Sequence, residues 1–590
     1  MFLKSNFNFN SIYQMKRLFT TFLVFALSQA FQLYNTYACT NFLVTKGASV
    51  KGSTMITYSA DSHQLYGELY FWPARDYPAG SMLDVYEWDT YRYMGKIRQV
   101  PHTYSVVGNM NEHQLSIGET TYGGIDNMVD PEGIIDYGSL IYITLQRAKS
   151  AREAIKVMSD LVSEYGYASP GESFSIADPN EVWIFEIIGK GKGNKGAIWV
   201  ARMIPDGYVS GHANQARIQT FPIATGKKTS VAITSKDFTR LFDPAVETIY
   251  AWDVIEVARA KNLFSGKDQD FSFSDIYNPI SFSGARFCEV RVWSFFKSVN
   301  DEMNQYFSYA SGHDLSKRMP LWIKPNRKLS NGDMMNLMRD HLEGTALDMR
   351  KDAGAGSFGS PYRWRPLQWK VTTDPNSHEY CNERAAATQQ TGFVFVAESR
   401  SWLPDPIGGI LWFGVDDAAT TVFNPIYCGI LNVPECFKEG NGDMLTYSPT
   451  SAFWVFNMVA NFCYSRYDLM SADALKVQKQ LESRYLSETD ATDEAAKKLY
   501  SADVWKAREY LTDYSIKCAQ NTFDQWKKLS EYLLVKYIDG NIKKEKDGKF
   551  ERSQDGCPVM PLQPGYSDGW KKSVIQDTGD KLLVPAGAKH

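Results

Sequence analysis

The sequence predicts an α+β fold, on three observations. Short β-favouring runs separated by Gly-rich turns follow residue 39, as in "TNFLV" and "STMITYSA". Between Ser139 and Tyr165, apolar residues recur three, four and seven positions apart, as they do on one face of a helix. Residues 466–540 consist mostly of helix formers with helical periodicity. Strands in the first part of the chain and long helices near its end are typical of an α+β protein.

The remaining elements follow from shorter patterns. The stretch "SFSIADPNEVWIFEII" predicts strand, turn, strand, with Asp-Pro-Asn as the turn. In "GKGKGNKG", residues 189–196, Gly191, Gly193 and Gly196 match GxGxxG, but a strand-like "AIWVAR" follows where a dinucleotide site needs a helix. We therefore predict a hairpin turn. Further along, "NGDMMNLMRDHLEG" indicates a helix capped by Asn331 or Asp333, and "TGFVFVAES" and "GGILWFGV" indicate strands.

Composition excludes some classes of function. The 590 residues are 44% apolar, 22% charged and 14% aromatic, which indicates a folded protein with a large core. The formal net charge of −4 argues against nucleic-acid binding, which needs a concentrated basic surface. Setting Cys39 aside, seven of the eight cysteines remain, and the sequence does not say which of them pair.

The first 38 residues resemble a secretory signal. Lys16 and Arg17 precede "LFTTFLVFALSQAF", an apolar run too short to span a membrane. Thr36 and Ala38 are small residues before a cut that would expose Cys39. We expect residues 1–38 to be removed and the mature protein to be exported, to the periplasm or outside the cell, with no stable membrane span.

The chemistry available points to Cys39. The chain has no HExxH or paired-Cys zinc pattern, no GxSxG elbow and no Walker sequence, so we predict neither a metal nor an organic cofactor. If cleavage exposed Cys39, its own α-amine, of ordinary pKa about 7.7–8.0, could serve as base for its own thiol. The alternatives are a disulfide-bonded or lipidated cysteine, although Thr36 and Tyr37 fit a lipidation signal poorly.

The chain also resembles a known family. "CTNFLVTKGASVKGSTMITYSADS", "MNEHQLSIGETTYGG", "GHANQARI" and "SPYRWRPLQW" are similar to blocks of the dipeptidase A family, cysteine peptidases of the N-terminal nucleophile (Ntn) hydrolase superfamily. The resemblance runs from residue 39 to about 427. It implies a four-layer αββα sandwich of two antiparallel sheets and cleavage of dipeptides through an acyl-enzyme.

Site roles carry over from this resemblance. Cys39 corresponds to the nucleophile, Asp61 to the aspartate that orients its amine, and Asn214 to an asparagine that positions substrate or oxyanion. Thr121 lies where related acylases carry an oxyanion asparagine. Arg291, or else Arg286, matches an arginine that lowers the thiol pKa or meets a substrate carboxylate. One departure is Tyr58, where relatives commonly have an arginine, so no fixed cation is expected there, although tyrosine could still donate a hydrogen bond.

The sequence thus predicts an exported cysteine dipeptidase with three parts: the leader at 1–38, the peptidase core at 39–450, and a mainly helical extension with an irregular tail at 451–590. Its partners would be dipeptide substrates, and a homo-oligomer is left open. One alternative is an amidase of the same mechanism acting on N-acyl or bile-acid conjugates. Another is a non-catalytic surface protein anchored through a lipidated Cys39.

Overall fold

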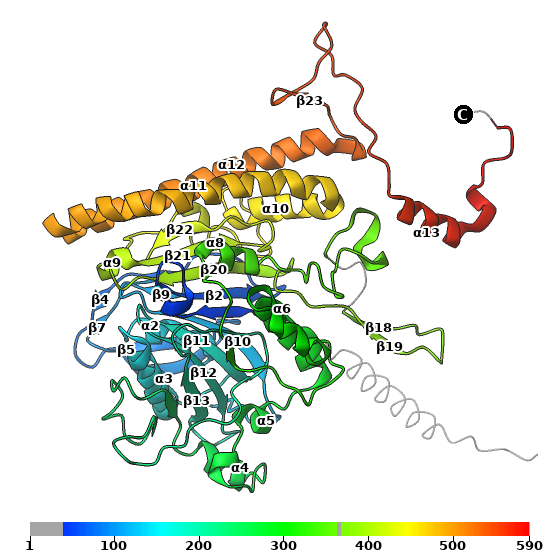
Figure 1. Cartoon of the computed structure of the whole chain (residues 1–590). Helices are drawn as coiled ribbons and strands as arrows, with labels where there is room; N and C mark the ends of the chain where they lie inside the picture. The colour runs from blue at the N-terminus through cyan, green and yellow to red at the C-terminus, as the bar shows by residue number, and fades with distance from the viewer. Residues whose placement is uncertain (1–38, 363–366, 589–590) are drawn as a thin grey trace, which may run out of the picture. The chain divides into compact units, whose positions relative to one another are not determined.

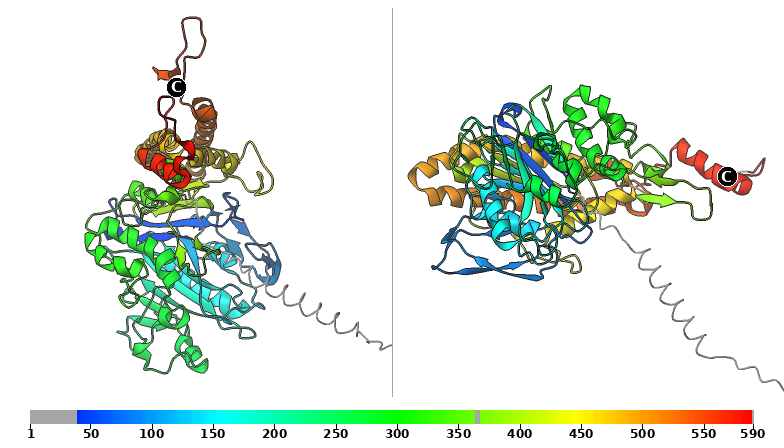
Figure 2. Two further views of the ribbon diagram at one scale, coloured as in Figure 1. Left: turned by 90° about the vertical axis from the view of Figure 1, so that its right-hand side faces the viewer. Right: turned by 90° about the horizontal axis from the view of Figure 1, so that it is seen from below.

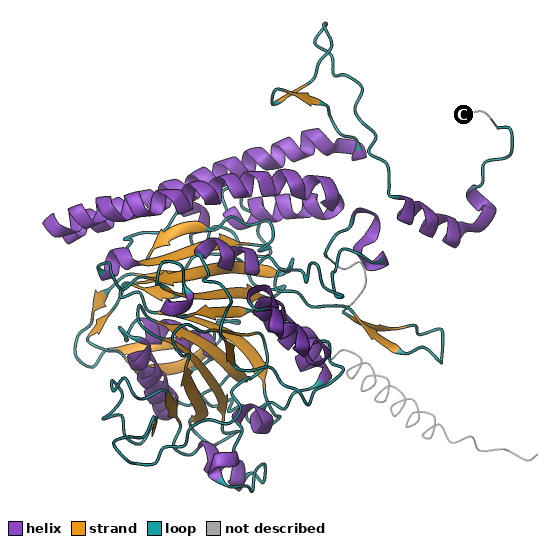
Figure 3. Cartoon of the chain, in the orientation of Figure 1, coloured by secondary structure: helices purple, strands orange, loops and turns teal. Residues whose placement is uncertain are grey.

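The computed structural model describes residues 39–362 and 367–588, which fold as an α+β unit built on two large sheets (Figures 1 and 3). The α+β class predicted from the sequence is confirmed. The predicted signal segment, residues 1–38, lies outside the described residues. All eight cysteines are free thiols.

The first sheet has seven strands and holds the start of the described chain at its centre. All neighbouring strands of this sheet are antiparallel, and Leu43 of β1 lies opposite Ile56 of β2. In spatial order the strands are β17 (Trp322–Ile323), β14 (Val209–His212), β1 (Asn41–Val44), β2 (Thr54–Asp61), β20 (Thr391–Ser399), β21 (Gly409–Val415) and β22 (Asn424–Tyr427).

The second sheet has nine strands, antiparallel except for one parallel pair, β15 with β16. In order they are β15 (Ala232–Thr234), β16 (Thr248–Tyr250), β13 (Ala197–Met203), β12 (Val182–Gly189), β11 (Gly171–Ala177), β10 (Ser116–Gly123), β9 (Met110–Asn111), β8 (Val106–Val107) and β3 (Phe71–Trp72). Its central strands β11 and β12 are buried along their whole length, since both faces are covered.

The two sheets pack face to face, with β1 and β2 of the first against β10 and β11 of the second. Gly118 of β10 permits this approach, because a Cβ there would lie 3.0 Å from Asn41 Oδ1 and 3.2 Å from Tyr58 Cβ. Helices cover the outer faces. The second sheet is covered by α2 (Tyr137–Leu145) and α3 (Ala151–Tyr165), and the first by α8 (Asn331–Leu337) and α10 (Ala452–Ser465) (Figure 2).

Two long helices, α11 (Tyr467–Ala502) and α12 (Val504–Tyr537), extend the helical layer over β22, as the helical periodicity of residues 466–540 predicts. A buried ion pair between Arg400 and Asp493 fastens α11 to the core. Tyr427 also donates a hydrogen bond of 2.8 Å to Asp493. Among the described residues, no helix combines the length and apolar character needed to cross a membrane.

Smaller elements surround these layers. The short strands pair as β4 (Arg75–Asp76) with β7 (His102–Thr103), β5 (Met82–Tyr86) with β6 (Tyr93–Arg98), β18 (Gln368–Lys370) with β19 (Glu379–Cys381), and β23 (Glu545–Lys546) with β24 (Lys549–Phe550). The other α-helices are α4 (Val254–Ala260), α5 (Phe273–Tyr277), α6 (Val290–Val299), α7 (Phe307–Ala310), α9 (Asp405–Gly408) and α13 (Asp568–Thr578).

Two predictions about helices need correction. The segment from Ser139 to Tyr165 is not one helix, because the chain breaks between α2 and α3 and Ser150 starts α3 by accepting the Glu153 N–H. The cap of α8 is Ser330, which forms a capping box with Asp333. The predicted hairpin turn at residues 189–196 is confirmed, since it joins β12 to β13.

Candidate active site

Cys39 lies at the entrance to the central strand β1, and its side chain is only 6% exposed. The next residue, Thr40, pairs with Ser59 of β2 through backbone hydrogen bonds of 3.4 and 3.1 Å. The Phe42 N–H donates to Thr57 Oγ1 at 2.9 Å. The chain next to the thiol is therefore anchored to β2, and β1 pairs with β14 on its other side.

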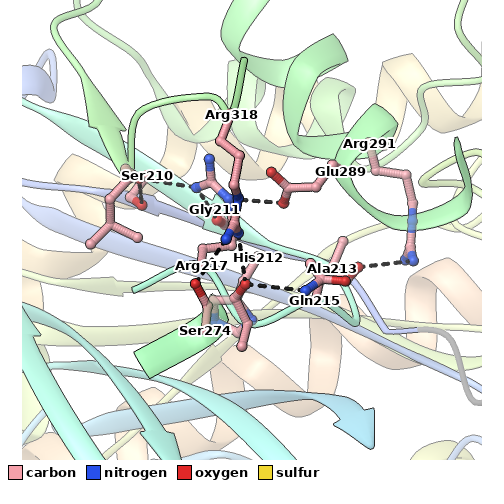
Figure 4. Close-up of polar contacts among 12 residues, drawn as sticks. Ser210, Gly211, His212, Ala213, Gln215, Arg217, Ser274, Glu289, Arg291 and Arg318 are labelled. Atoms are coloured by element: carbon pink, nitrogen blue, oxygen red, sulfur yellow. Dashed lines mark hydrogen bonds and ion pairs between the residues drawn. The ribbon is translucent and has the colours of Figure 1, made fainter. Parts of the chain in front are cut away.

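Arg291, in the first turn of α6, fixes the backbone of Cys39. Its Nη1 donates to the Cys39 carbonyl at 2.7 Å and to Thr40 Oγ1 at 2.9 Å. A π-helical turn, η3 (Gly284–Glu289), precedes it, and such turns are frequent at functional sites. Figure 4 shows Arg291 directed at Ala213, beside the ion pair of Arg217 with Glu289. The alternative, Arg286, pairs with Glu383 instead.

Asn214 follows β14 and faces the same guanidinium. Arg291 Nη2 donates to Asn214 Oδ1 at 2.9 Å, and Asn214 Nδ2 donates to the Thr121 carbonyl at 2.7 Å. The φ of Asn214 is 58°, a left-handed conformation that asparagine tolerates better than most residues. The Asn214 side chain thus links Arg291 to the Thr121 carbonyl. Thr121 is close by, but its hydroxyl donates to Glu172 Oε1 at 2.9 Å.

Asp61 ends β2 and is buried among three donors. Thr391 Oγ1 donates to Oδ1 at 2.7 Å, while Ser59 Oγ and Arg384 Nη2 lie 3.2 and 3.3 Å from Oδ2. Burial raises the pKa of Asp61, and Arg384 and Thr391 oppose that rise. Arg384 thus places a positive charge beside Asp61, although the residue at position 58, a tyrosine, carries none.

A pair of buried glutamates completes the surroundings of the thiol, and sequence reasoning missed both. Glu119 on β10 has its Oε1 3.6 Å from Cys39 Sγ, and Tyr58 donates to the same oxygen at 2.6 Å. Burial raises the pKa of Glu119 to about 7. Glu172 on β11, diagonal to Glu119 across the two strands, has a pKa raised well above its usual range by burial and then by Glu119. The hydrogen bond that sequence reasoning allowed for Tyr58 is confirmed, with Glu119 as its acceptor.

The thiol itself is held in its protonated form. Burial, then the charges of Glu119 and Asp61, raise the pKa of Cys39 well above its usual value, while a hydrogen bond from the Asp61 backbone N–H opposes the rise. Because the thiolate is the attacking form, a nucleophile here needs a base or a nearby positive charge. In the full-length chain the nitrogen of Cys39 is an amide joined to Ala38, so it can be neither.

A narrow cavity of about 20 Å³ lies beside Tyr58. That volume holds about one water molecule, so a larger ligand requires movement of the walls. Among the residues that the structure describes, no group of three His, Cys, Asp or Glu side chains is arranged to hold a metal. The cavity is lined largely by aromatic side chains, among them Tyr58, Tyr70, Trp72, Trp88, Tyr137, Tyr142 and Phe393.

The structure therefore brings the five residues expected from the sequence into one connected region: Cys39, Asp61, Thr121, Asn214 and Arg291. A buried thiol with an arginine on its carbonyl, an amide donor and an aspartate nearby is a candidate active site.

Comparison with known proteins gives the family. The model described as "Peptidase family C69" matches residues 68–480, so the chain belongs to this peptidase family. That match covers Thr121, Asn214 and Arg291 but begins after Cys39 and Asp61.

Individual relatives are similar over most of their length. The chain is 25% identical to "Probable dipeptidase" of Latilactobacillus sakei over 480 residues, covering 78% of this chain and 88% of the relative. It is 22% identical to "Probable dipeptidase B" of Streptococcus pyogenes serotype M1 over 540 residues, covering 88% and 97%. It is also 22% identical to "Probable dipeptidase" of Salmonella dublin over 435 residues, covering 70% and 86%.

Proposed function

We propose that this C69 peptidase is an exported dipeptidase that uses Cys39 as an N-terminal nucleophile after loss of residues 1–38. The observation that carries the proposal is the position of Cys39: a buried thiol at the start of a central strand, with Arg291 holding its carbonyl at 2.7 Å. Two facing sheets between helical layers are the αββα arrangement expected of an Ntn hydrolase. The printed names of the relatives support dipeptides as substrates.

The reaction would begin once cleavage frees the Cys39 amine. This amine accepts the thiol proton, and the thiolate sulfur attacks the scissile carbonyl carbon. Negative charge then develops on the carbonyl oxygen, where the second N–H of the Asn214 amide and backbone N–H groups stabilise it. The ammonium returns its proton to the leaving amine as the C–N bond breaks, which leaves an acyl-thioester on Cys39.

Water completes the cycle. The free amine takes a proton from water, the oxygen attacks the thioester carbonyl, and the sulfur leaves and is reprotonated. Asp61 would hold the amine in the orientation that both steps need, since it accepts hydrogen bonds and sits two residues beyond Ser59, the partner of Thr40. No metal or organic cofactor takes part in this scheme.

The test combines N-terminal sequencing of the secreted form with dipeptide hydrolysis by variants. We expect the mature protein to begin at Cys39 and Cys39→Ala to abolish hydrolysis. Cys557→Ser, at an exposed thiol in the tail, is the matched control and should keep full activity. An active secreted form that still carries residues before Cys39, or a Cys39 that carries a lipid anchor, would refute the mechanism.

A further inference from the structure

The pair Glu119–Glu172 has an unusual balance of charge. Both side chains are buried, and in each of them Oε2 receives no donor from the described chain. Besides burial, the two carboxyls are influenced by a hydrogen bond between them, by nearby acids, by the hydroxyls of Tyr58 and Thr121 and by the Cys39 thiol, and none of these is a cation. A buried acid pair without a cation is costly unless it shares a proton or binds a positive ligand.

The position of the pair relative to the thiol suggests which ligand. A substrate carbonyl carbon must come within about 3–3.5 Å of Cys39 Sγ for attack. The α-nitrogen of an unblocked dipeptide is two bonds from that carbon, about 2.5 Å away. Glu119 Oε1 is 3.6 Å from Sγ, so an ammonium at the usual 2.7–2.9 Å from this carboxyl can belong to a substrate poised for attack.

We propose that Glu119 and Glu172 form the binding site for the free α-ammonium of the substrate and so restrict the enzyme to substrates with an unblocked N-terminus. This inference rests on the proposed function and deepens it. Glu119 contacts the ammonium beside the thiol, and Glu172 supplies the second acceptor from the adjacent strand. A substrate without this charge would leave the acid pair buried and unpaired.

The neighbouring hydroxyl groups support the proposed roles of Glu119 and Glu172. Tyr58 already donates to Glu119 Oε1 at 2.6 Å, and Thr121 to Glu172 Oε1 at 2.9 Å, so these hydroxyls orient the carboxyls and leave the Oε2 atoms for the ligand. Raised pKa values let the pair hold a proton while the site is empty and release it when a cation arrives. The tyrosine at position 58 is therefore a positioning residue for the ammonium site.

The test compares alanyl-leucine with propionyl-leucine, which differ only in the α-ammonium, by release of leucine. We expect the wild type to prefer alanyl-leucine in kcat/KM by at least about 100-fold. Glu172→Gln should lower kcat/KM for alanyl-leucine by about 10- to 100-fold, the usual worth of a hydrogen bond to a charged group, and change propionyl-leucine less than about threefold. Glu119→Gln should also reduce the preference for alanyl-leucine over propionyl-leucine in kcat/KM.

Glu186→Gln, at another buried carboxyl of the same sheet, is the matched control and should leave the preference unchanged. A wild type that cleaves both substrates equally, or a Glu172→Gln enzyme that loses both activities in parallel, overturns the inference while the proposed function stands. A wild type that cleaves neither, or dipeptide cleavage that survives Cys39→Ala, defeats the proposed function itself. Should either variant fail to fold, the wild type still tests the inference, because equal cleavage of alanyl-leucine and propionyl-leucine would overturn it.

Discussion

Replacing Arg291 by lysine tests whether the site depends on the guanidinium fork or only on its charge. Arg291 is 1% exposed, and lysine keeps the positive charge but loses the planar fork. Its acceptors are the Phe287, Cys39 and Ala213 carbonyls, Thr40 Oγ1 and Asn214 Oδ1, at 2.7–3.3 Å.

The expected size follows from these bonds. An ammonium has three donors at one point, so at least two of the five acceptors lose their partner. Each buried acceptor left without a donor costs about 1–3 kcal/mol, so the loss of two partners in Arg291→Lys should lower the free energy of unfolding by about 2–6 kcal/mol. The Cys39 carbonyl and the Asn214 amide would also shift, and a displacement near 1 Å costs about 100-fold in kcat.

The assay is urea unfolding followed by fluorescence, together with dipeptide hydrolysis per folded molecule. The control is Arg318→Lys, which disturbs a neighbouring arginine bonded to Ser274 Oγ and the Ala216 carbonyl but not to Cys39 or Asn214. It should lose stability and keep kcat. If Arg291→Lys retains kcat within about threefold of the wild type, or if Arg318→Lys loses as much, the positioning role is wrong.

Three further results are expected. Asp61→Asn keeps the Thr391 bond but removes the charge, so kcat should fall about 100-fold or more with little change in KM; an unchanged kcat would exclude an orienting role. Burial raises the pKa of Asp416 to about 8, so the folded state keeps this carboxyl protonated while the unfolded state ionises near pH 4, and the free energy of unfolding falls as pH rises from about 4 to 8. Asp416→Asn should flatten that decline and raise the free energy of unfolding by about 2–4 kcal/mol at pH 7, as measured by urea titration. Asp493→Ala leaves Arg400 buried without its partner and should cost about 3–5 kcal/mol by the same measurement, with the double variant carrying Arg400→Met recovering part of the loss.

Local pattern was enough to predict several of the long strands of both sheets. The strands at "TNFLV", "STMITYSA", "TGFVFVAES" and "GGILWFGV" are present because each is an apolar run bounded by turn residues, and burial on both faces selects such runs. The break between α2 and α3 was missed because apolar periodicity continues through it. The helix is interrupted because the Ser150 side chain caps α3 and the Ala151 N–H donates to Asp178. Asp178 comes after the end of α3 in the sequence.

In the candidate active site, contacts between residues far apart in the sequence were also missed. The site residues expected from the family resemblance lie together in the structure. Arg384, however, contacts Asp61 although the two residues are 323 positions apart in the sequence, and no local pattern could predict that contact. Glu119 and Glu172 did leave a signal, since each is a charged residue within a strand that is otherwise small, polar or apolar. Acidic side chains are rarely buried without a reason, so a glutamate in the middle of a core strand merits a functional interpretation from sequence alone.

In the proposed mechanism, removal of residues 1–38 would activate the site by changing its electrostatics. Burial, Glu119 and Asp61 together raise the pKa of the Cys39 thiol, and Arg291 donates to the carbonyl of Cys39. Cleavage before Cys39 would create an amine of ordinary pKa about 7.7–8.0 in the same residue. As a free base that amine would remove the thiol proton, and as an ammonium it would offset the charge of Asp61, so a single cut would supply both the base and the positive charge that the buried thiol lacks.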